Sequence, residues 1–501
     1  MKICFLLLLF FSLNISSQVI YFNNYLADDL SINSADSILS FEKDQNSLHI
    51  KFLNFSDSLI NFLNQKSFFL FHRVEKSEGV GVLIRADKLF EFSFPIYSFL
   101  TSSLTVDCSK KDKFGMHTKI TYNVINLCKN KFIKDFIDST QVYPYLGKLE
   151  NFYNEFYYSV IPNLSLYLKA FEYIRFEAGY FTLFIGNGYR TLFLNDLTLP
   201  YYYFRSLVEL PKVKYLFQYS ILREGQWKSF NNSFENKCMT FHFFEMNLTK
   251  NLTLNGIEMV IWQAKDSFEN RFFEINYAIP LLFLRPVEWA LGSPDNVIMG
   301  LGLSYKFWNY LLYCQVILDD INFEIFKQKK DWWGNKFGCQ LGIKSYKLFN
   351  IHNLFYLFEL NIVRPFTYSY ATYLKNYGNY HLPLAHPLGA NFVEFVSILQ
   401  YKLKKFVLSI KSFYQLQGLS ENFNVGNNIY VSYNYNRNDY GNYLLNGKLF
   451  KNYNFYFNLS YLLRKNFCLY LEIGQSFHLK NNYMLIGISN NLNRKFLLNN
   501  L

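Results

Sequence analysis

Hydrophobic and polar residues alternate along much of the C-terminal half of the chain. Between residues 453 and 463 every odd position is Tyr, Phe or Leu, whereas three of the five even positions are Asn or Ser. The same alternation recurs in residues 301–307, 337–344 and 406–411. Side chains of a β-strand point alternately to its two faces, so this period of two predicts strands with one apolar and one polar face.

The length and spacing of these segments favour a membrane barrel over a soluble sandwich. A sandwich would give shorter pieces with a polar outer face, whereas here one face is aromatic and aliphatic and the other carries Gly, Ser, Asn and Gln. We therefore predict an all-β fold, a large transmembrane antiparallel β-barrel over residues 151–501. At roughly 20 residues per strand and connection, this length corresponds to about 16–18 strands.

The beginning of the chain reads as an export signal. Lys2 precedes an apolar run over residues 3–11, and small polar residues follow over residues 12–18. The run is shorter than the roughly 20 residues of a spanning helix, so we expect a signal peptide over residues 1–17. The most apolar later stretch, residues 278–292, is interrupted by prolines and charges. An exported chain without a continuous apolar segment is consistent with a barrel in the cell outer membrane.

Residues 18–150 differ from the rest because they mix Asp, Ser and Leu without clean alternation. Short helices are predicted here, for example over residues 57–65, where Ser and Asp can cap them. We interpret this part as a small N-terminal periplasmic or plug-like α/β region. The first barrel strands can begin within it, near residues 81–100.

Composition narrows the class of protein. Hydrophobic residues make up 50% and charged residues 18%, which excludes extensive disorder. The 55 Phe and 41 Tyr exceed the content of an ordinary cytosolic enzyme, although AT-rich codon usage accounts for part of this excess. The net charge of +12 is spread along the chain without a dense basic run, so we expect no nucleic-acid partner.

The cysteines leave two interpretations open. The chain has seven, and Cys4 would leave with the signal peptide. No C-x-x-C spacing occurs, and we expect no metal site and no cofactor. A disulfide between Cys108 and Cys128 would suit an oxidising periplasm. Alternatively, all six remaining cysteines are small apolar fillers.

Five motifs occur in a fixed order between residues 186 and 392. They are Gly186-Asn187-Gly188-Tyr189-Arg190 with Asn195-Asp196; Arg285-Pro286-Val287-Glu288 with Ser293-Pro294-Asp295; Asp331-Trp332-Trp333-Gly334-Asn335-Lys336; Glu359-Leu360-Asn361 with Arg364-Pro365-Phe366; and Asn376-Tyr377-Gly378 with His386-Pro387-Leu388-Gly389-Ala390-Asn391. In this order they resemble the Wzi-type capsule-assembly family of outer-membrane proteins, closest to its gliding-motility protein RemB branch. The resemblance covers roughly residues 175–420.

The resemblance implies a many-stranded outer-membrane barrel with a helical or plug element. In the capsule branch it implies a lectin that holds capsular polysaccharide at the cell surface, and in the gliding branch a role in motility. The resemblance implies no catalytic residues in this chain. We therefore predict a non-enzymatic barrel that binds or anchors surface or capsular polysaccharide and supports gliding motility. The expected partners are outer-membrane lipid, surface polysaccharide and proteins of motility or secretion machinery.

Aromatic residues beside amide and cationic residues are the best ligand-like feature, since aromatic rings pack on sugar faces while polar groups bind hydroxyls. The same rings would also suit an aromatic girdle at the membrane–water interface. The candidate glycan-binding residues are Trp332, Trp333, Asn335, Lys336, Tyr368, Tyr377 and Asn391.

Several charged residues lie beside apolar barrel segments. A charge facing lipid at the membrane midplane costs about 2–4 kcal/mol, so we expect these side chains in the lumen or in loops. There they either bind sugar or ions, or brace the barrel interior as charge pairs. The candidates for this lumen network are Arg190, Asp196, Arg285, Glu288, Asp295, Glu359 and Arg364.

Signals for enzymatic chemistry are weak. Asp319-Asp320 would point to opposite faces of a strand, and the spacing of His381 and His386 matches no metal motif, so we predict a strand-end turn and a structured loop. Gly186-Asn187-Gly188 lacks the lysine of a phosphate-binding loop and is predicted to form a tight turn at a strand end.

An outer-membrane channel or transporter, suggested by the polar faces of the predicted strands, is the alternative function. A hydrolase acting on lipid or polysaccharide is a third hypothesis.

Overall fold

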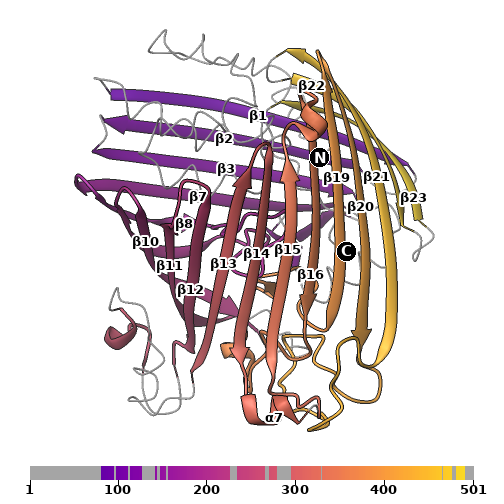
Figure 1. Cartoon of the computed structure of the whole chain (residues 1–501). Coiled ribbons are helices and arrows are strands. Elements are labelled where there is room, and N and C mark those ends of the chain that lie inside the picture. Colours follow the sequence, from indigo (N-terminus) through magenta and orange to yellow (C-terminus); the bar gives the residue numbers. More distant parts are fainter. Residues whose placement is uncertain are drawn as a thin grey trace.

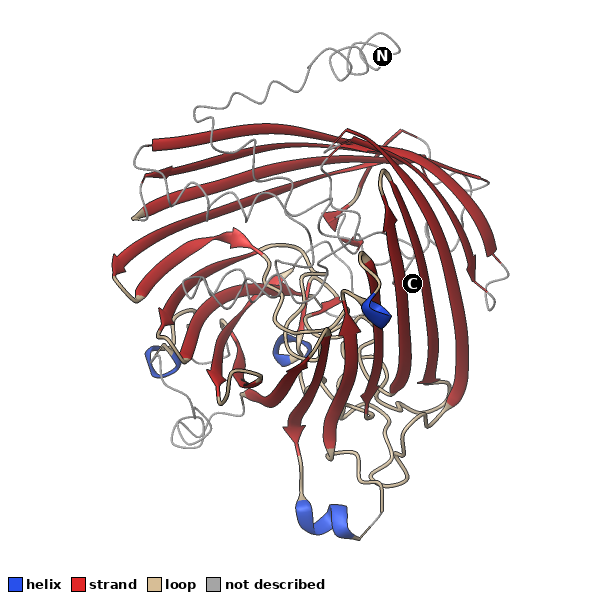
Figure 2. Cartoon of the chain, turned by 45° about the horizontal axis from the view of Figure 1, so that its top comes forward, coloured by secondary structure: helices blue, strands red, loops and turns tan. Residues whose placement is uncertain are grey.

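The strands of the protein form one closed antiparallel barrel (Figures 1 and 2). A computed structural model describes residues 80–94, 98–110, 113–126, 142–143, 147–153, 156–225, 234–265, 270–278, 295–328, 330–464, 467–476 and 481–490. Within these residues the main sheet has 19 strands. The short strand β6 pairs only with β7, and the other 18 strands form the ring. This confirms the predicted fold class and strand number.

The strands of the main sheet are β1 (Val80–Phe94), β2 (Ser98–Lys110), β3 (Phe114–Asn126), β6 (Glu150–Tyr153), β7 (Phe156–Phe171), β8 (Ile174–Phe181), β9 (Tyr201–Glu209), β10 (Val213–Glu224), β11 (Glu235–Asn247), β12 (Leu252–Gln263), β13 (Asn296–Phe307), β14 (Tyr310–Asp320), β15 (Lys336–Ser345), β16 (Leu354–Val363), β19 (Phe392–Leu403), β20 (Phe406–Leu419), β21 (Lys448–Arg464), β22 (Phe467–Ser476) and β23 (Asn481–Asn490). Two small hairpins lie outside it, namely β4 (Val142–Tyr143) with β5 (Gly147–Lys148), and β17 (Gly378–Asn379) with β18 (Leu382–Pro383). The helical elements are α7 (Phe323–Lys327) and the single 3-10 turns η5 (Ile275–Tyr277), η6 (Leu348–Asn350) and η7 (Tyr373–Lys375).

The ring closes where the first strand meets the last. β1 pairs antiparallel with β2 on one side and with β23 on the other. Strands β1, β2 and β3 precede residue 151 and lie in the region where the sequence allows the first strands to begin. The expected signal peptide and the rest of the chain before Val80 lie outside the described residues.

The two faces of the strands divide as the alternation predicts. On β13, Leu301, Leu303 and Tyr305 are exposed, whereas Gly302 and Ser304 between them are buried. On β21, Asn452 and Asn454 are buried on the inner face. The apolar outer belt can contact lipid tails, and polar side chains line the interior.

The two ends of the barrel differ in their connections. At one end, eight turns of two to eight residues join the strands, for example residues 404–405 between β19 and β20. At the other end, seven of the nine connections between the described strands contain 10 to 32 residues, and α7 lies in one of them (Figure 1). In outer-membrane barrels the short turns face the periplasm and the long loops face outward, so this end is the extracellular mouth.

Helices contribute little to this architecture. Among the described residues, no helix is both long enough and apolar enough to cross a membrane.

Candidate functional site

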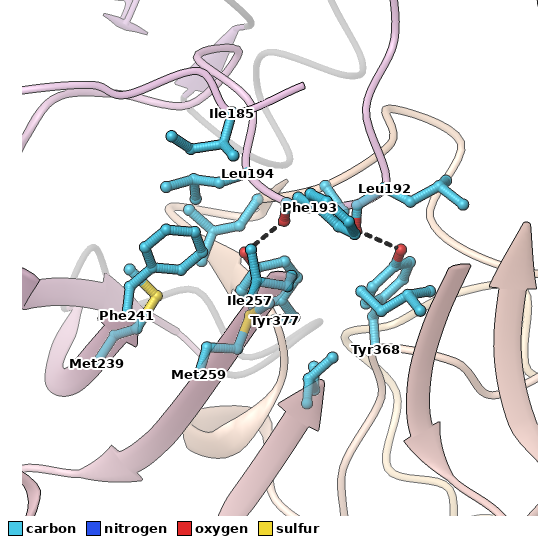
Figure 3. Close-up of a cluster of buried hydrophobic side chains, with 14 of the residues drawn as sticks. Ile185, Leu192, Phe193, Leu194, Met239, Phe241, Ile257, Met259, Tyr368 and Tyr377 are labelled. Carbon is cyan, nitrogen blue, oxygen red and sulfur yellow. Dashed lines mark hydrogen bonds between the residues drawn. The ribbon is translucent and has the colours of Figure 1, made fainter. Parts of the chain in front are cut away.

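Residues 182–200, which we call the lumen segment, connect β8 to β9 and fold into the barrel. Ile185 and Leu194 form a bridge across the segment, and their neighbours Leu192 and Phe193 are fully buried. They pack against inward side chains of β11 and β12, including Met239, Phe241 and Met259 (Figure 3). The apolar residues of this connection therefore form a core inside the barrel.

The tip of the lumen segment lies deep in the barrel. Lys344 Nζ donates a hydrogen bond of 2.6 Å to the carbonyl oxygen of Asn187. Lys344 is the penultimate residue of β15 and lies next to its short-turn end. Gly186-Asn187-Gly188 is thus the tip of a long inserted segment, and the prediction of a tight turn at a strand end is wrong.

Glu359 on β16 accepts hydrogen bonds from four donors, two of which are backbone amides next to this tip. Its Oε2 accepts hydrogen bonds from the backbone N–H of Tyr189 and from the Tyr313 hydroxyl, each 2.8 Å long. Its Oε1 accepts from the backbone N–H of Arg190 at 3.1 Å and from Asn361 Nδ2 at 2.8 Å. A Cβ atom at Gly188 would lie 2.0 Å from Glu359 Oε2, so only glycine fits here.

Arg190 makes a second attachment, to Glu394 on β19. The Nε and Nη2 atoms of Arg190 lie 3.3 Å from the two carboxylate oxygens of Glu394, and both side chains are buried. Glu394 also binds His386 Nε2 at 2.7 Å and accepts a hydrogen bond of 2.9 Å from Gln415. The structure thus brings the candidates Arg190 and Glu359 together, and it adds Glu394 and His386. Glu394 is the one charged residue among the buried inward positions of β19, and this is the sequence signal that could have identified it.

The connection between β16 and β19, residues 364–391, holds the lumen segment from the mouth side. The hydroxyls of Tyr368 and Tyr377 donate to the carbonyl oxygens of Leu192 and Phe193 at 2.9 and 2.6 Å (Figure 3). The two tyrosine rings stack 5.6 Å apart and are fully buried. Burial also raises the pKa of both hydroxyls, which therefore stay protonated donors.

Five of the seven candidate glycan-binding residues are buried and bonded within the protein. Besides Tyr368 and Tyr377, these are Asn335, Lys336 and Asn391. Lys336 pairs with Asp319 at 2.9 Å, and Asn391 donates to the carbonyl oxygens of Gly418 and Asn446. The polar side-chain groups of these five candidates are thus engaged by partners within the protein.

Trp332 and Trp333 are different because both remain half-buried at the extracellular mouth. Their rings lie 5.6 Å apart, and Tyr433 lies 4.6 Å from Trp333. The guanidinium of Arg437 stacks 4.0 Å from the Trp333 ring, and Tyr370 packs edge-on against Tyr433. We call Trp332, Trp333, Tyr370, Tyr433 and Arg437 the mouth cluster.

Backbone hydrogen bonds fix the mouth cluster. The amide of Trp333 donates to the carbonyl oxygen of Asp439, and Gly441 and Asn442 donate to Lys330 and Asp331. Two connections far apart in sequence, residues 321–335 and 420–447, therefore present one surface.

Of the other predicted lumen residues, Asp295 and Arg364 lie at the mouth, Asp196 lies in the lumen segment, and two lie outside the described residues. Asp295 binds Arg271 at 2.8 Å and Lys375 at 3.2 Å. Arg364 donates to the carbonyl oxygens of Asn335 and Asn442 and pairs with Asp331, and burial lowers the pKa of its guanidinium. Asp196 is half-buried in the lumen segment. Arg285 and Glu288 are not among the described residues, nor is Cys128 of the suggested disulfide.

Asp319 and Asp320 are the last two residues of β14 and not the predicted turn, and their side chains point to opposite faces, one buried and one exposed. His381 and His386 lie in the ordered connection 364–391, also as predicted. Within the described residues, no three His, Cys, Asp or Glu side chains gather as a metal-ligand set.

Acid is expected to loosen the connection 364–391 through His381. Burial and the Lys237 ammonium lower the pKa of His381 to about 4, from the ordinary 6.5, although Glu224 lies beside the ring. The neutral ring is the folded form, so its stabilisation is complete above pH 6.5 and is lost as the pH falls toward 4. The loss is about 3 kcal/mol at 1.36 kcal/mol per pKa unit. Urea unfolding in detergent at a series of pH values would measure it. In His381→Gln this part of the pH dependence should vanish, and an unchanged profile would contradict the assignment.

Comparison with known proteins gives a likeness in fold. No protein-family model and no curated protein matches the sequence. Among solved structures, the chain is similar to Wzi of Escherichia coli, described as a carbohydrate-binding β-barrel involved in group 1 capsule assembly. The TM-score is 0.53 at 11% identity, over 91% of this chain and 92% of that one. Pseudomonas aeruginosa OccK10 (OpdN) matches with a TM-score of 0.44 at 9% identity, over 82% and 99% of the two chains.

The closed ring and its apolar outer belt make the chain a transmembrane barrel. Such single-chain barrels belong to outer membranes, and the matched fold is that of an outer-membrane protein. The protein is therefore an outer-membrane β-barrel with a Wzi-like fold.

Proposed function

We propose that the protein is a non-enzymatic outer-membrane barrel that binds and anchors surface polysaccharide at its extracellular mouth. The observation that carries this proposal is the mouth cluster, which presents aromatic rings and a guanidinium beside a lumen occupied by the protein's own chain.

The chemistry of the mouth cluster suits a sugar polymer. Aromatic faces pack against the C–H faces of sugar rings, and Arg437 and the tyrosine hydroxyls can bind hydroxyl or carboxylate groups. More tyrosines surround the cluster on the connection 420–447, where Tyr435, Tyr440 and Tyr443 are exposed. The fixed backbone of the two connections keeps these rings in place before a ligand arrives, which favours binding.

The fold likeness is consistent with this proposal. Wzi is described as a carbohydrate-binding barrel, and we propose the same class of ligand here. A deletion strain provides the direct test, by comparing cell-attached with released polysaccharide. We expect polysaccharide to shift into the medium, and unchanged retention would contradict anchoring.

Changing both Trp332 and Trp333 to Ala should weaken glycan binding at least about tenfold, because each removes an aromatic face from the mouth cluster. Binding of purified surface polysaccharide to the detergent-solubilised barrel would measure this. Phe323→Ala and Phe326→Ala, which remove exposed rings of α7, form a matched control. Unchanged binding in the folded tryptophan variant would exclude this cluster as the site.

We further propose that support of gliding motility follows from polysaccharide anchoring. Spreading on agar should be scored in the same deletion cultures. A strain that retains its polysaccharide but fails to spread would point instead to a motility-machinery partner.

A channel remains the second candidate, because polar side chains such as Ser409, Asn452 and Asn454 line the inner faces of β20 and β21. Conductance in planar bilayers distinguishes the two. Steady ion flow through the unmodified protein would favour the channel, and a persistently closed barrel would exclude it.

A further inference from the structure

The charge of the two barrel ends is unequal. The described extracellular connections between residues 182 and 447 contain eight basic and seven acidic residues. The basic residues are Arg190, Lys265, Arg271, Lys327, Lys330, Arg364, Lys375 and Arg437, and the acidic ones are Asp196, Glu274, Asp295, Glu324, Asp331, Glu421 and Asp439. In the described residues of the short turns there are six lysines and one acidic residue, Glu172. The lysines are Lys113, Lys212, Lys250, Lys347, Lys404 and Lys405.

We call these turns the short-turn rim, comprising residue 113 and residues 172–173, 210–212, 248–251, 308–309, 346–353 and 404–405. All its lysines except Lys347 are exposed. Within the described part of the chain, none of these six makes a salt bridge with a carboxylate. Their ammonium groups are therefore available to an external anion.

Large apolar side chains on the same rim, or directly next to its turns, are also exposed. Trp308 has 90% of its surface exposed, Phe349 77% and Phe171 66%. Leu403 and Phe406 flank the Lys404-Lys405 turn directly and are also exposed. Apolar side chains with adjacent ammonium groups match the boundary between acyl chains and headgroups, where aromatic rings sit at headgroup level.

We propose that the short-turn rim binds anionic phospholipid headgroups in the periplasmic leaflet. The apolar residues enter the acyl boundary, and the lysines pair with the phosphates at the same level. Charge complementarity and the exposed apolar side chains of the rim commit the surface to a lipid, since an aqueous acidic polymer would leave Trp308 and Phe349 in water. This binding is independent of the mouth cluster, which lies at the opposite end of the barrel.

The test uses the full-length barrel in neutral detergent, titrated with phosphatidylglycerol or phosphatidylcholine and followed by native mass spectrometry. The rim variant changes Lys212, Lys250, Lys404 and Lys405 to Gln. The matched control changes Lys265, Lys327, Lys330 and Lys448 to Gln, which removes the same charge from the extracellular end. Heat-dependent electrophoretic mobility confirms that each variant is folded.

We expect the rim variant to bind phosphatidylglycerol about tenfold more weakly, with phosphatidylcholine binding unchanged. The control variant should behave like the unmodified protein. Equal loss in both variants would show a net-charge effect and overturn the proposal. Unchanged phosphatidylglycerol binding in the rim variant, with loss of sedimentation on peptidoglycan sacculi, would assign the rim to an acidic polymer instead and also overturn it.

Discussion

Replacing the lumen segment, residues 182–200, with Asn-Gly should convert a closed barrel into a conducting pore. Phe181 and Tyr201 face each other in the β8–β9 register, so a two-residue hairpin turn can join them without moving the strands. A ring of 16–18 strands encloses a water-filled channel unless something fills it. In this protein the segment between Ile185 and Leu194 occupies the interior of the barrel.

Single-channel recording in planar bilayers would measure this effect. The unmodified protein should be silent and the shortened variant should conduct. Tyr368→Phe with Tyr377→Phe is a matched control, because it removes two hydrogen bonds to the lumen segment but keeps the segment itself. We expect only brief openings from that control. A folded but silent deletion variant would show that the connection 364–391, and not the lumen segment, closes the barrel.

Arg190→Ala is expected to destabilise the protein by about 3–5 kcal/mol, the range for breaking a buried charge pair. The loss leaves Glu394 buried with His386, Gln415 and Asn361 but without its guanidinium. It also detaches the side chain that ties the lumen segment to β19. Urea unfolding in detergent would measure the free energy, and the same preparation would show ion leakage in bilayers.

Arg190→Lys tests whether the positive charge alone stabilises Glu394 or whether the paired hydrogen bonds of the guanidinium are also needed. A lysine keeps the positive charge but cannot form two parallel hydrogen bonds to the carboxylate, so an intermediate loss is expected. Lys411→Ala is a further control, since it removes a nearby cation whose ammonium lies 5.6 Å from the centre of the Tyr189 ring. A loss of less than about 1 kcal/mol in Arg190→Ala would be typical of an exposed pair and would contradict a structural role.

The fold could be predicted from the sequence because lipid imposes a local rule. Each strand must show an apolar face outward and can show small or polar residues inward, so Leu301, Gly302 and Leu303 already indicate their directions. The predicted 16–18 strands match the ring of 18, although three of these strands precede residue 151, where the predicted barrel begins. Strands β1 to β3 were harder to delimit, because Ser occurs at both even and odd positions of β2, which blurs the alternation in the sequence.

The site could be predicted only in part, since it depends on contacts between distant residues. Arg190 and Glu359 were identified as lumen residues because an unpaired charge cannot face lipid. Their partners could not be inferred, because Glu394 is 204 positions from Arg190. The burial of Tyr368 and Tyr377 was missed for a similar reason. A Tyr in a loop can either pack inside the protein or bind a ligand. Here the hydroxyls donate to the carbonyl oxygens of Leu192 and Phe193, and the sequence does not reveal these contacts.

The junction of β1 with β23 sets the order in which the barrel can be completed. The pairing covers seven residue pairs, from Lys88 with Asn490 to Phe94 with Met484, whereas β1 and β2 share thirteen. During synthesis β1 is made long before β23, so one edge of β1 stays unpaired until β23 has been synthesised. An open edge cannot remain in hydrocarbon, so insertion and closure must be coupled late events. Truncating the chain before β23 should therefore block assembly, although the sequence of every other strand is retained.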